Sequence, residues 1–145
     1  MRLLIDTNVF IDYFVQNNNY SLIRNLFLLC DEQNHEIYVS TMTIRDTGYI
    51  LQKYLHDKDK CRLVQNKIYQ MANKIVPVSA DAMIETLYSD YSDFEDGLII
   101  EAAAESMCDA IVTSDTSGFK KSSIPAYSLD EINQRLLKLH PYKDR

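Results

Sequence analysis

The sequence is poor in the residues that the best-known cofactor sites require. Its three glycines, Gly48, Gly97 and Gly118, lie far apart. This spacing excludes the glycine-rich loops that bind nucleoside triphosphates or dinucleotides. The apolar runs are far shorter than the ~20 residues of a membrane-spanning helix, so we expect a protein that does not enter the membrane. Its function must be sought in other side chains.

Histidine and cysteine are also scarce and scattered. The three histidines lie far from one another and from the cysteines, which disfavours a structural zinc site or a serine or cysteine triad. The cysteines, Cys30, Cys61 and Cys108, form no CxxC pair and are odd in number. Such a pattern favours free thiols in a reducing compartment. With no signal-peptide pattern at the start of the chain, we expect a cytoplasmic protein.

The bulk composition is that of an ordinary globular protein. The chain has 145 residues, of which 46% are hydrophobic and 25% charged. We expect one domain over residues 1–139 and a frayed tail over residues 140–145. The net charge of −6 speaks against broad attraction to nucleic acid. It does not exclude a nuclease, because bound cations would neutralise a cluster of acids.

Short apolar segments alternate with helical patterns along the whole chain. Strands are predicted at residues 2–5, 37–40, 75–78, 110–113 and 124–127. Helices are predicted from residue 7 or 8 onward and at residues 21–33, 43–55, 57–71, 82–88, 93–107 and 129–139. This alternation is typical of a mostly parallel sheet covered on both faces. The sequence therefore predicts an α/β fold, a three-layer α/β/α sandwich around that sheet.

Acidic residues recur where predicted strands end and predicted helices begin. Asp6 ends the first strand, Asp46 lies in the first turn or so of a helix, and Asp115 follows the fourth strand. Asp93 and Asp96 bracket the start of an alanine-rich helix. The carboxyl ends of parallel strands share one edge of a sheet, where ligands bind. Because converging carboxylates repel and are tolerated mainly around a cation, this recurrence predicts a metal site.

Each acid also has a local explanation. Asp6 or Asp93 would cap the helix that follows it. Asp46 would favour the positive end of a helix, and Asp115 would form a turn. Haloacid-type phosphatases also place an aspartate after the first strand, but they need a second acid two residues later, where this chain has Asn8. The joint recurrence, and no single acid, supports the shared site.

Four segments together resemble the successive motifs of the PIN domain family. They are residues 3–10 (LLIDTNVF), 39–46 (VSTMTIRD), 93–104 (DFEDGLIIEAAA) and 111–115 (IVTSD), in the order of the family. The chain is also similar in length to the single-domain VapC-type toxins. The resemblance implies a PIN fold and a metal-dependent ribonuclease.

The resemblance further implies which acids hold the metal. Asp6, Asp96 and Asp115 match the acids of the family, and Asp46 stands where the family usually has glutamate. We expect Asp6, Asp46 and Asp96 to bind one Mg²⁺ or Mn²⁺, and Asp115 to help bind a second ion or orient a water. The shorter side chain of Asp46 is expected to weaken direct coordination. Gly97 replaces a common alanine and is expected to loosen the helix start.

Further candidates flank these acids. Asp93 would serve as an accessory acid, and Thr113 or Ser114 would hydrogen-bond a ligand water or a phosphate. Three basic residues beside the motifs are candidates for contacts with RNA phosphates, although ordinary surface charge explains them equally well: Arg45, Lys120 and Lys121.

The resemblance also implies partners, namely an RNA substrate, an antitoxin protein and a second copy in a homodimer. Interface candidates in the early helices, most of which must also serve the core, are Phe10, Tyr13, Phe14, Leu26 and Phe27. Two alternatives stay open. One is a PIN-like module that binds RNA or protein without cleaving, its site weakened by Asp46. The other is a housekeeping RNA-processing nuclease with the same chemistry.

Overall fold

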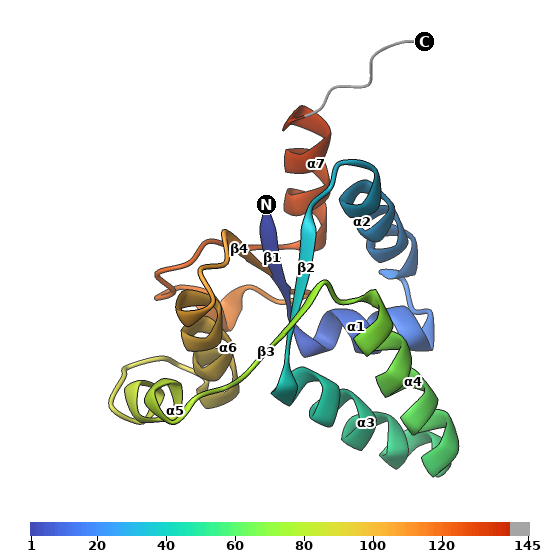
Figure 1. Cartoon of the computed structure of the whole chain (residues 1–145), viewed down its shortest axis with the longest axis horizontal. Helices are drawn as coiled ribbons and strands as arrows, with labels where there is room; N and C mark the ends of the chain where they lie inside the picture. Colours follow the sequence, from blue (N-terminus) through green and yellow to red (C-terminus); the bar gives the residue numbers. More distant parts are fainter. Residues whose placement is uncertain (140–145) are drawn as a thin grey trace.

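A single sheet of parallel strands lies at the centre of the computed structural model, which describes residues 1–139 (Figure 1). The strands are β1 (Arg2–Ile5), β2 (Glu36–Ser40), β3 (Lys74–Val76), β4 (Ala110–Val112) and β5 (Ala126–Tyr127). Their order in the sheet is β3-β2-β1-β4-β5, and every neighbouring pair is parallel. The predicted α/β class is thus confirmed, whereas the predicted tail at 140–145 falls outside the described residues.

Helices connect the strands and cover the sheet. They are α1 (Thr7–Val15), α2 (Tyr20–Glu32), α3 (Thr41–Leu55), α4 (Lys58–Met71), α5 (Ala80–Leu87), α6 (Phe94–Glu105), the 3₁₀ helix η1 (Ser117–Phe119) and α7 (Leu129–Leu139). The limits that were predicted lie within two residues of those observed, whereas η1 was not predicted. In the described part of the chain, no helix is long and apolar enough to cross a membrane.

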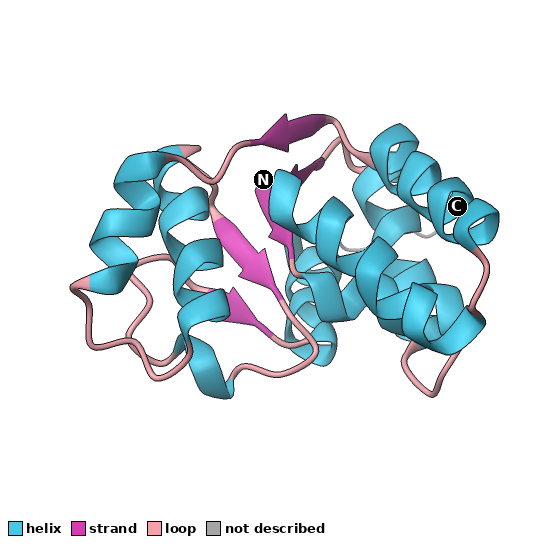
Figure 2. Ribbon diagram, turned by 90° about the horizontal axis from the view of Figure 1, so that it is seen from below, coloured by secondary structure: helices cyan, strands magenta, loops and turns pink. Residues whose placement is uncertain are grey.

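The sheet lies between two helical layers, as Figure 2 shows from below. Alternate residues of β1 point to opposite faces, because side chains alternate along a strand. Leu3 and Ile5 join a core with residues of α1, α2, α4 and α7. Leu4 joins the core on the other face, which packs against α6. The apolar run of β1 is therefore buried on both sides, as expected for a central parallel strand.

The aromatic residues of the early helices belong mainly to this core. Phe10 and Leu26 are fully buried, so neither is available as an interface residue. Tyr13, Phe14 and Phe27 are half-buried and pack against the same core. The Phe27 ring lies 6.0 Å from that of Phe10 and 5.4 Å from that of Tyr13. Packing between α1 and α2 thus accounts for most of these side chains.

The strand order places a crevice at the carboxyl ends of β1 and β4. From β1 the chain builds the sheet first toward β2 and β3, and later, on the other side, toward β4 and β5. In open α/β sheets, ligands bind where the order reverses in this way. Asp6 follows β1 at this point, and its backbone N–H donates to the Val112 carbonyl at 2.9 Å. The fold therefore brings the ends of two predicted motifs together.

Helix α3 begins two residues earlier than predicted. The Ser40 hydroxyl caps it by accepting a hydrogen bond from the Thr43 backbone N–H at 3.1 Å. Asp46 consequently lies in the second turn of α3 and not in the first. A favourable interaction with the helix dipole falls off within the first turn, so this local explanation for Asp46 loses its basis.

Candidate active site

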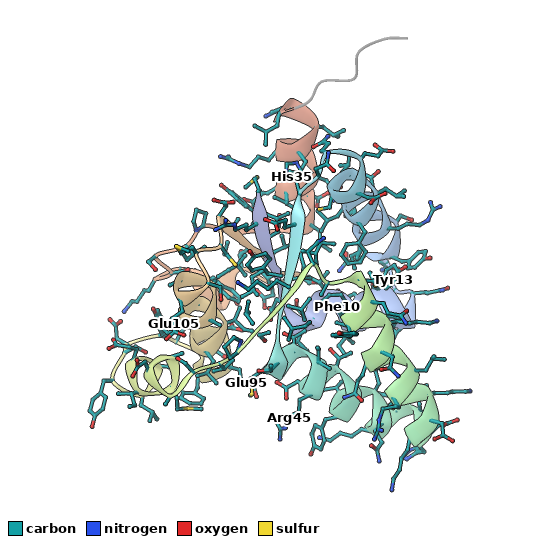
Figure 3. The ribbon with its side chains drawn as sticks, in the orientation of Figure 1. Phe10, Tyr13, His35, Arg45, Glu95 and Glu105 are labelled. Atoms are coloured by element: carbon teal, nitrogen blue, oxygen red, sulfur yellow. The ribbon has the colours of Figure 1, made fainter. Side chains whose placement is uncertain are left out.

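A cleft of about 710 Å³ opens at the carboxyl edge of the sheet, between α1, α3 and the start of α6. Figure 3 labels Arg45 of α3 and Glu95 of α6 at this end of the molecule. Both side chains line the cleft. The acids that line it are Asp6, Asp12, Asp46, Glu95 and Asp96. Three of the four acids predicted to hold metal therefore share one cavity.

Asp6 is the most buried of these acids, with 6% of its surface exposed. Its Oδ1 accepts a hydrogen bond from the Thr7 backbone N–H at 2.8 Å, so Asp6 does cap α1. Its Oδ2 accepts from the Thr113 hydroxyl at 2.9 Å. Burial raises the pKa of this carboxyl against the opposing effect of both hydrogen bonds.

Thr113 holds Asp6 in place. It is fully buried, and its hydroxyl, besides donating to Asp6, lies 3.2 Å from both the Asn8 Nδ2 and the Asp115 backbone N–H, which donate to it. The single proton and both acceptor positions of the hydroxyl are thereby used. Thr113 was predicted to bond a ligand water or a phosphate, but in the structure its hydroxyl bonds Asp6. Thr113 therefore orients the Asp6 carboxylate.

Ser114 takes part in a second network at the junction of α1 and β4. Its hydroxyl donates to Asp12 Oδ2 at 2.8 Å, and its backbone N–H donates to Asn8 Oδ1 at 3.1 Å. Asn17 and Asn19 also donate to the Asp12 carboxylate. The loop after β4 is therefore fixed to α1 by side chains of α1 itself. The sequence prediction did not assign these roles to Asn8 and Asp12, although their spacing of four residues, about one helical turn, was an available signal.

Asp96 also has a strongly raised pKa in the cleft. Burial first, and then the charges of Asp6, Asp93, Asp115 and Glu95, raise the pKa of its carboxyl to about 7. A shift of this kind arises when several carboxylates share one region without a compensating charge. Perturbed acids in a cleft mark a candidate functional site. Glu95, which the sequence prediction did not single out, belongs to this group.

Two glycines shape the surroundings of Asp96. A Cβ at Gly118 would lie 1.8 Å from Asp96 Oδ2, so only glycine lets η1 approach the carboxylate this closely. A Cβ at Gly97 would lie 2.7 Å from Thr86 Cγ2 and 2.8 Å from Tyr91 Cδ2. Gly97 is buried and permits close packing at the start of α6. The expectation that it loosens the helix is therefore replaced by a packing role.

Asp46 lies across the cleft on α3 and is half-buried. Its Oδ1 is 3.0 Å from Nη1 of its neighbour Arg45, whose side chain is 70% exposed. Arg45 also lines the cleft. This ion pair is local and largely exposed to solvent, so it contributes little to stability. Asp46 and Arg45 are thus placed where a ligand could engage either of them.

Asp93 and Asp115 lie outside the lining of the cleft, and both are exposed. Asp93 caps α6 by accepting from the Asp96 backbone N–H at 2.9 Å. Asp115 Oδ1 accepts from the Ser117 backbone N–H at 3.0 Å, and this bond lowers the pKa of Asp115. Both local explanations are confirmed. Their charges nevertheless reach Asp96, because both contribute to its raised pKa.

The two lysines predicted to contact RNA are not part of the cleft lining. Lys120 follows η1 and is exposed. Lys121 forms an ion pair with Asp90 at 2.5 Å, and this pair lowers the pKa of Asp90. Of the three predicted basic residues, only Arg45 faces the acids.

The donors around the cleft suit a hard divalent cation. Carboxylate oxygens predominate, and Mg²⁺ and Mn²⁺ prefer such ligands. Within residues 1–139, no three acidic, histidine or cysteine side chains stand close enough to hold an ion as they are now oriented. Asp46 bonds its neighbour Arg45, so the Asp46 side chain would have to rotate before it could bind an ion. The chemistry of the donors fits such an ion.

Comparisons with known proteins agree with this fold. The sequence matches the PIN domain family over residues 2–117, whereas no curated protein sequence matches it. VapBC2 from Rickettsia felis, solved bound to a DNA fragment from its promoter, is similar with a TM-score of 0.65 and 18% identity, covering 88% of this chain and 98% of that chain. FitAB bound to an IR36 DNA fragment is similar with a TM-score of 0.64 and 18% identity, covering 88% and 94%.

A third structure is VapC20 from Mycobacterium tuberculosis, a toxin that cleaves the sarcin-ricin loop. Its TM-score is 0.64 at 11% identity, with 84% of this chain and 95% of that chain covered. At these identities the structures show a shared fold. The family match spans most of the chain and includes the ends of β1, β2 and β4 and the start of α6. This chain therefore belongs to the PIN domain family.

Proposed function

We propose that this protein is a metal-dependent endoribonuclease that hydrolyses RNA phosphodiester bonds. Asp6, Asp46 and Asp96 would hold Mg²⁺ or Mn²⁺, and Asp115 would help to hold a second ion or to orient the attacking water. The observation that carries the proposal is the cleft at the strand ends, in which burial raises the pKa values of both Asp6 and Asp96. Such groups are stabilised when a cation is present.

Bound divalent ions would activate a water and stabilise the leaving oxygen of the phosphodiester. The chain's own residues provide the geometry for this chemistry. Thr113 fixes one oxygen of Asp6 at 2.9 Å, and the Gly118 backbone leaves room for the Asp96 carboxylate. Asp96, with a pKa of about 7, must release its proton before it can act as a ligand. Binding of the ion should therefore strengthen as the pH rises toward 8.

Membership of the family supports RNA as the substrate and a toxin role. PIN domains are a nuclease family, and VapC20, with a similar fold, is a toxin that cleaves the sarcin-ricin loop. A toxin-antitoxin complex from Klebsiella pneumoniae also has a similar fold. We therefore include an antitoxin among the partners of this chain. A small antitoxin gene beside the gene for this chain would favour the toxin role over a housekeeping nuclease.

A homodimer is the second partner that we include. Several exposed large apolar side chains lie on and just after α5, where we expect a protein contact. These residues are Met83, Ile84, Leu87, Tyr88 and Phe94. Analytical ultracentrifugation of the purified chain checks this expectation. A monomer at all concentrations would remove the homodimer from the proposal without affecting the nuclease.

The test of the proposed function is cleavage of a fluorescent RNA pool by the purified protein. We expect cleavage with Mg²⁺ or Mn²⁺, none after chelation by EDTA, and a loss of rate on the order of 10³-fold with Asp6→Asn under the same conditions. Asp81→Asn, which changes an exposed acid in the first turn of α5, is the matched control and should cleave normally. Cleavage that persists in EDTA, or that falls less than about 10-fold in Asp6→Asn, would contradict the proposal.

The alternative function is a PIN-like module that binds RNA or protein without cleaving it. Asp46 favours this alternative, because it is one methylene shorter than the usual glutamate and is paired with Arg45. The same assay separates the two functions. Metal-dependent cleavage supports the nuclease, whereas RNA binding without cleavage in either metal supports the module.

A further inference from the structure

A basic and aromatic groove continues from the acidic cleft along α3. Arg45, Tyr49 and Lys53 line the cleft from one face of that helix. A second hollow, of about 440 Å³, shares Tyr49 and Lys53 with the cleft. Its remaining lining residues are Gln52, His56 and Lys58. We call this second hollow, with its five lining residues, the α3 groove.

The charge of the α3 groove is opposite to that of the whole protein. The chain carries a net charge of −6, but the lining of the groove contains Lys53 and Lys58 and no carboxylate among the described residues. The nearby Asp57 is engaged in capping α4, and its Oδ1 accepts from two backbone N–H groups at 3.1 Å each. A positive path beside an acidic site suits a polyanion that would otherwise be repelled.

Tyr49 adds an aromatic surface to the groove. Its side chain is 58% exposed, and Lys53 Nζ lies 4.5 Å from the centre of its ring. Exposed aromatic rings among cationic side chains are the usual platforms on which unpaired bases stack. Tyr54, on the same helix, is 76% exposed but lines neither hollow. It provides a matched tyrosine outside the groove.

We infer that the α3 groove binds the single-stranded RNA next to the bond that is cleaved. Tyr49 stacks on one base, and Lys53 and Lys58 contact phosphates. The inference rests on the proposed nuclease function, since the groove matters as an extension of that site. A helical rise of ~1.5 Å per residue places Lys53 ~10 Å from Asp46 along α3, about three bases at ~3.4 Å each. Bases in a duplex would not be free to stack on Tyr49.

The test is binding of a short fluorescent single-stranded oligoadenosine by the Asp96→Asn protein, which holds the RNA intact. Adding Tyr49→Ala should weaken binding about 10-fold, the effect typical of losing one stacked base. Tyr49→Phe keeps the ring and should bind as the parent does. Tyr54→Ala removes a more exposed tyrosine from the same helix and should also bind as the parent does.

The lysines are tested through the salt dependence of the same binding. Lys53→Gln and Lys58→Gln should each lower the slope of log affinity against log salt by about 0.7, the value for one phosphate contact on a single strand. Lys138→Gln makes the same charge change on α7, at the opposite end of the molecule from α3 (Figure 1). It should leave the slope unchanged.

The outcomes distinguish this inference from the proposed function. Equal binding by the Tyr49→Ala and Tyr54→Ala proteins, or tighter binding of duplex RNA than of single-stranded RNA, contradicts RNA binding by the α3 groove even if the wild type cleaves RNA. Tyr49-dependent binding without metal-dependent cleavage by the wild type supports RNA binding by the groove and contradicts the nuclease function. Absence of both binding and cleavage contradicts both proposals.

Discussion

The two walls of the acidic cleft are built in different ways. One wall, at the ends of β1 and β4 and the start of α6, carries Asp6 and Asp96, whose pKa values are raised mainly by burial. The other wall, on α3, carries Asp46 beside the exposed Arg45. The first wall is fixed by Thr113 and Gly118, whereas Asp46 is bonded by the exposed side chain of its neighbour Arg45.

This difference indicates a division of tasks. Burying carboxylates near one another destabilises their charged forms, so the first wall is arranged for a cation and tolerates little change. The ion pair between Asp46 and Arg45 on α3 can reorient at low cost, because the Arg45 side chain is 70% exposed. Ion pairs at the surface contribute only ~0–1 kcal/mol to stability. Substitutions in the first wall should therefore change metal affinity and cleavage strongly, and substitutions on α3 should change them little.

The largest effect is expected for Asp6→Asn. Loss of a metal ligand should lower the cleavage rate on the order of 10³-fold, since metal ions supply several kcal/mol of transition-state stabilisation. The fold should persist, because the amide has the same shape and removes a buried charge. Steady-state cleavage together with thermal unfolding checks both points. A loss of less than 10-fold would show that Asp6 is not a ligand.

Gly118→Ala should follow, with about a 10²-fold loss of cleavage. The new Cβ would lie 1.8 Å from Asp96 Oδ2, so the carboxylate must move, and displacements of ~1 Å in a reacting site cost about this much. Gly48→Ala is the control, since its Cβ would meet the flexible end of Gln65, outside the cleft. It should change stability and leave Mg²⁺ activation intact. If Gly118→Ala and Gly48→Ala changed Mg²⁺ activation equally, a role of Gly118 in positioning Asp96 would be excluded.

Thr113→Val removes the hydroxyl that fixes Asp6. We expect Mg²⁺ affinity to fall about 10-fold to 100-fold, as is common when the group that orients a metal ligand is lost. Thr86→Val also removes a buried hydroxyl, one that donates to the Ala82 carbonyl of its own helix. Its Mg²⁺ affinity should match the wild type while stability falls by a similar amount. Unchanged Mg²⁺ affinity in Thr113→Val would mean that Asp6 does not depend on this contact.

The pH dependence of stability should report the charge of Asp96. Because the pKa of Asp96 in the folded, metal-free protein is about 7, well above the ordinary value of 3.8 for an aspartate, the folded state binds more protons between these two pH values. The free energy of unfolding should therefore fall as the pH rises from about 4 to 7. After allowance for solvent screening, we expect ~1–2 kcal/mol.

Urea denaturation at about pH 5 and pH 8 measures this change. The decline should be smaller in Asp96→Asn and unchanged in Asp81→Asn, which replaces an exposed acid of α5. If all three proteins lose the same stability between these pH values, the field at Asp96 is weaker than its burial and neighbours indicate.

The smallest effect is expected for Asp46→Glu. The longer side chain restores the residue usual in the family, and we expect only about a 3-fold gain in Mg²⁺ affinity, because the α3 wall can adjust. Stability should change by less than about 0.5 kcal/mol, as for other exposed ion pairs. Calorimetric titration compares the two proteins. A gain of 100-fold would show that the α3 wall is as constrained as the other.

The sequence predicted the fold well because local signals agreed with one another. Short apolar runs marked β1 and β2, and α6 had an alanine-rich buried side and a recognisable cap. Asp93 was expected to cap α6, and it does so. The start of α3 was placed two residues late, because the capping role of Ser40 gave a weaker signal than the apolar pattern after Thr43.

The site was less accessible from the sequence, because its contacts join distant segments. The bond from Thr113 to Asp6 spans 107 positions, and no local pattern reveals that Thr113 serves another residue of the chain. The contact between Gly118 and Asp96 likewise depends on how η1 meets α6. Lys121 was placed near RNA by its position beside a motif, whereas the fold pairs it with Asp90.

The central claim is that the first wall of the cleft binds a divalent cation through Asp96. Calorimetric titration of Mn²⁺ into wild-type and Asp96→Asn protein, near pH 6.5 in two buffers of different ionisation enthalpy, tests it most directly. We predict saturable binding to the wild type with release of a proton, and loss of both in Asp96→Asn. Identical titrations of the two proteins, or no saturable binding to the wild type, would contradict the claim.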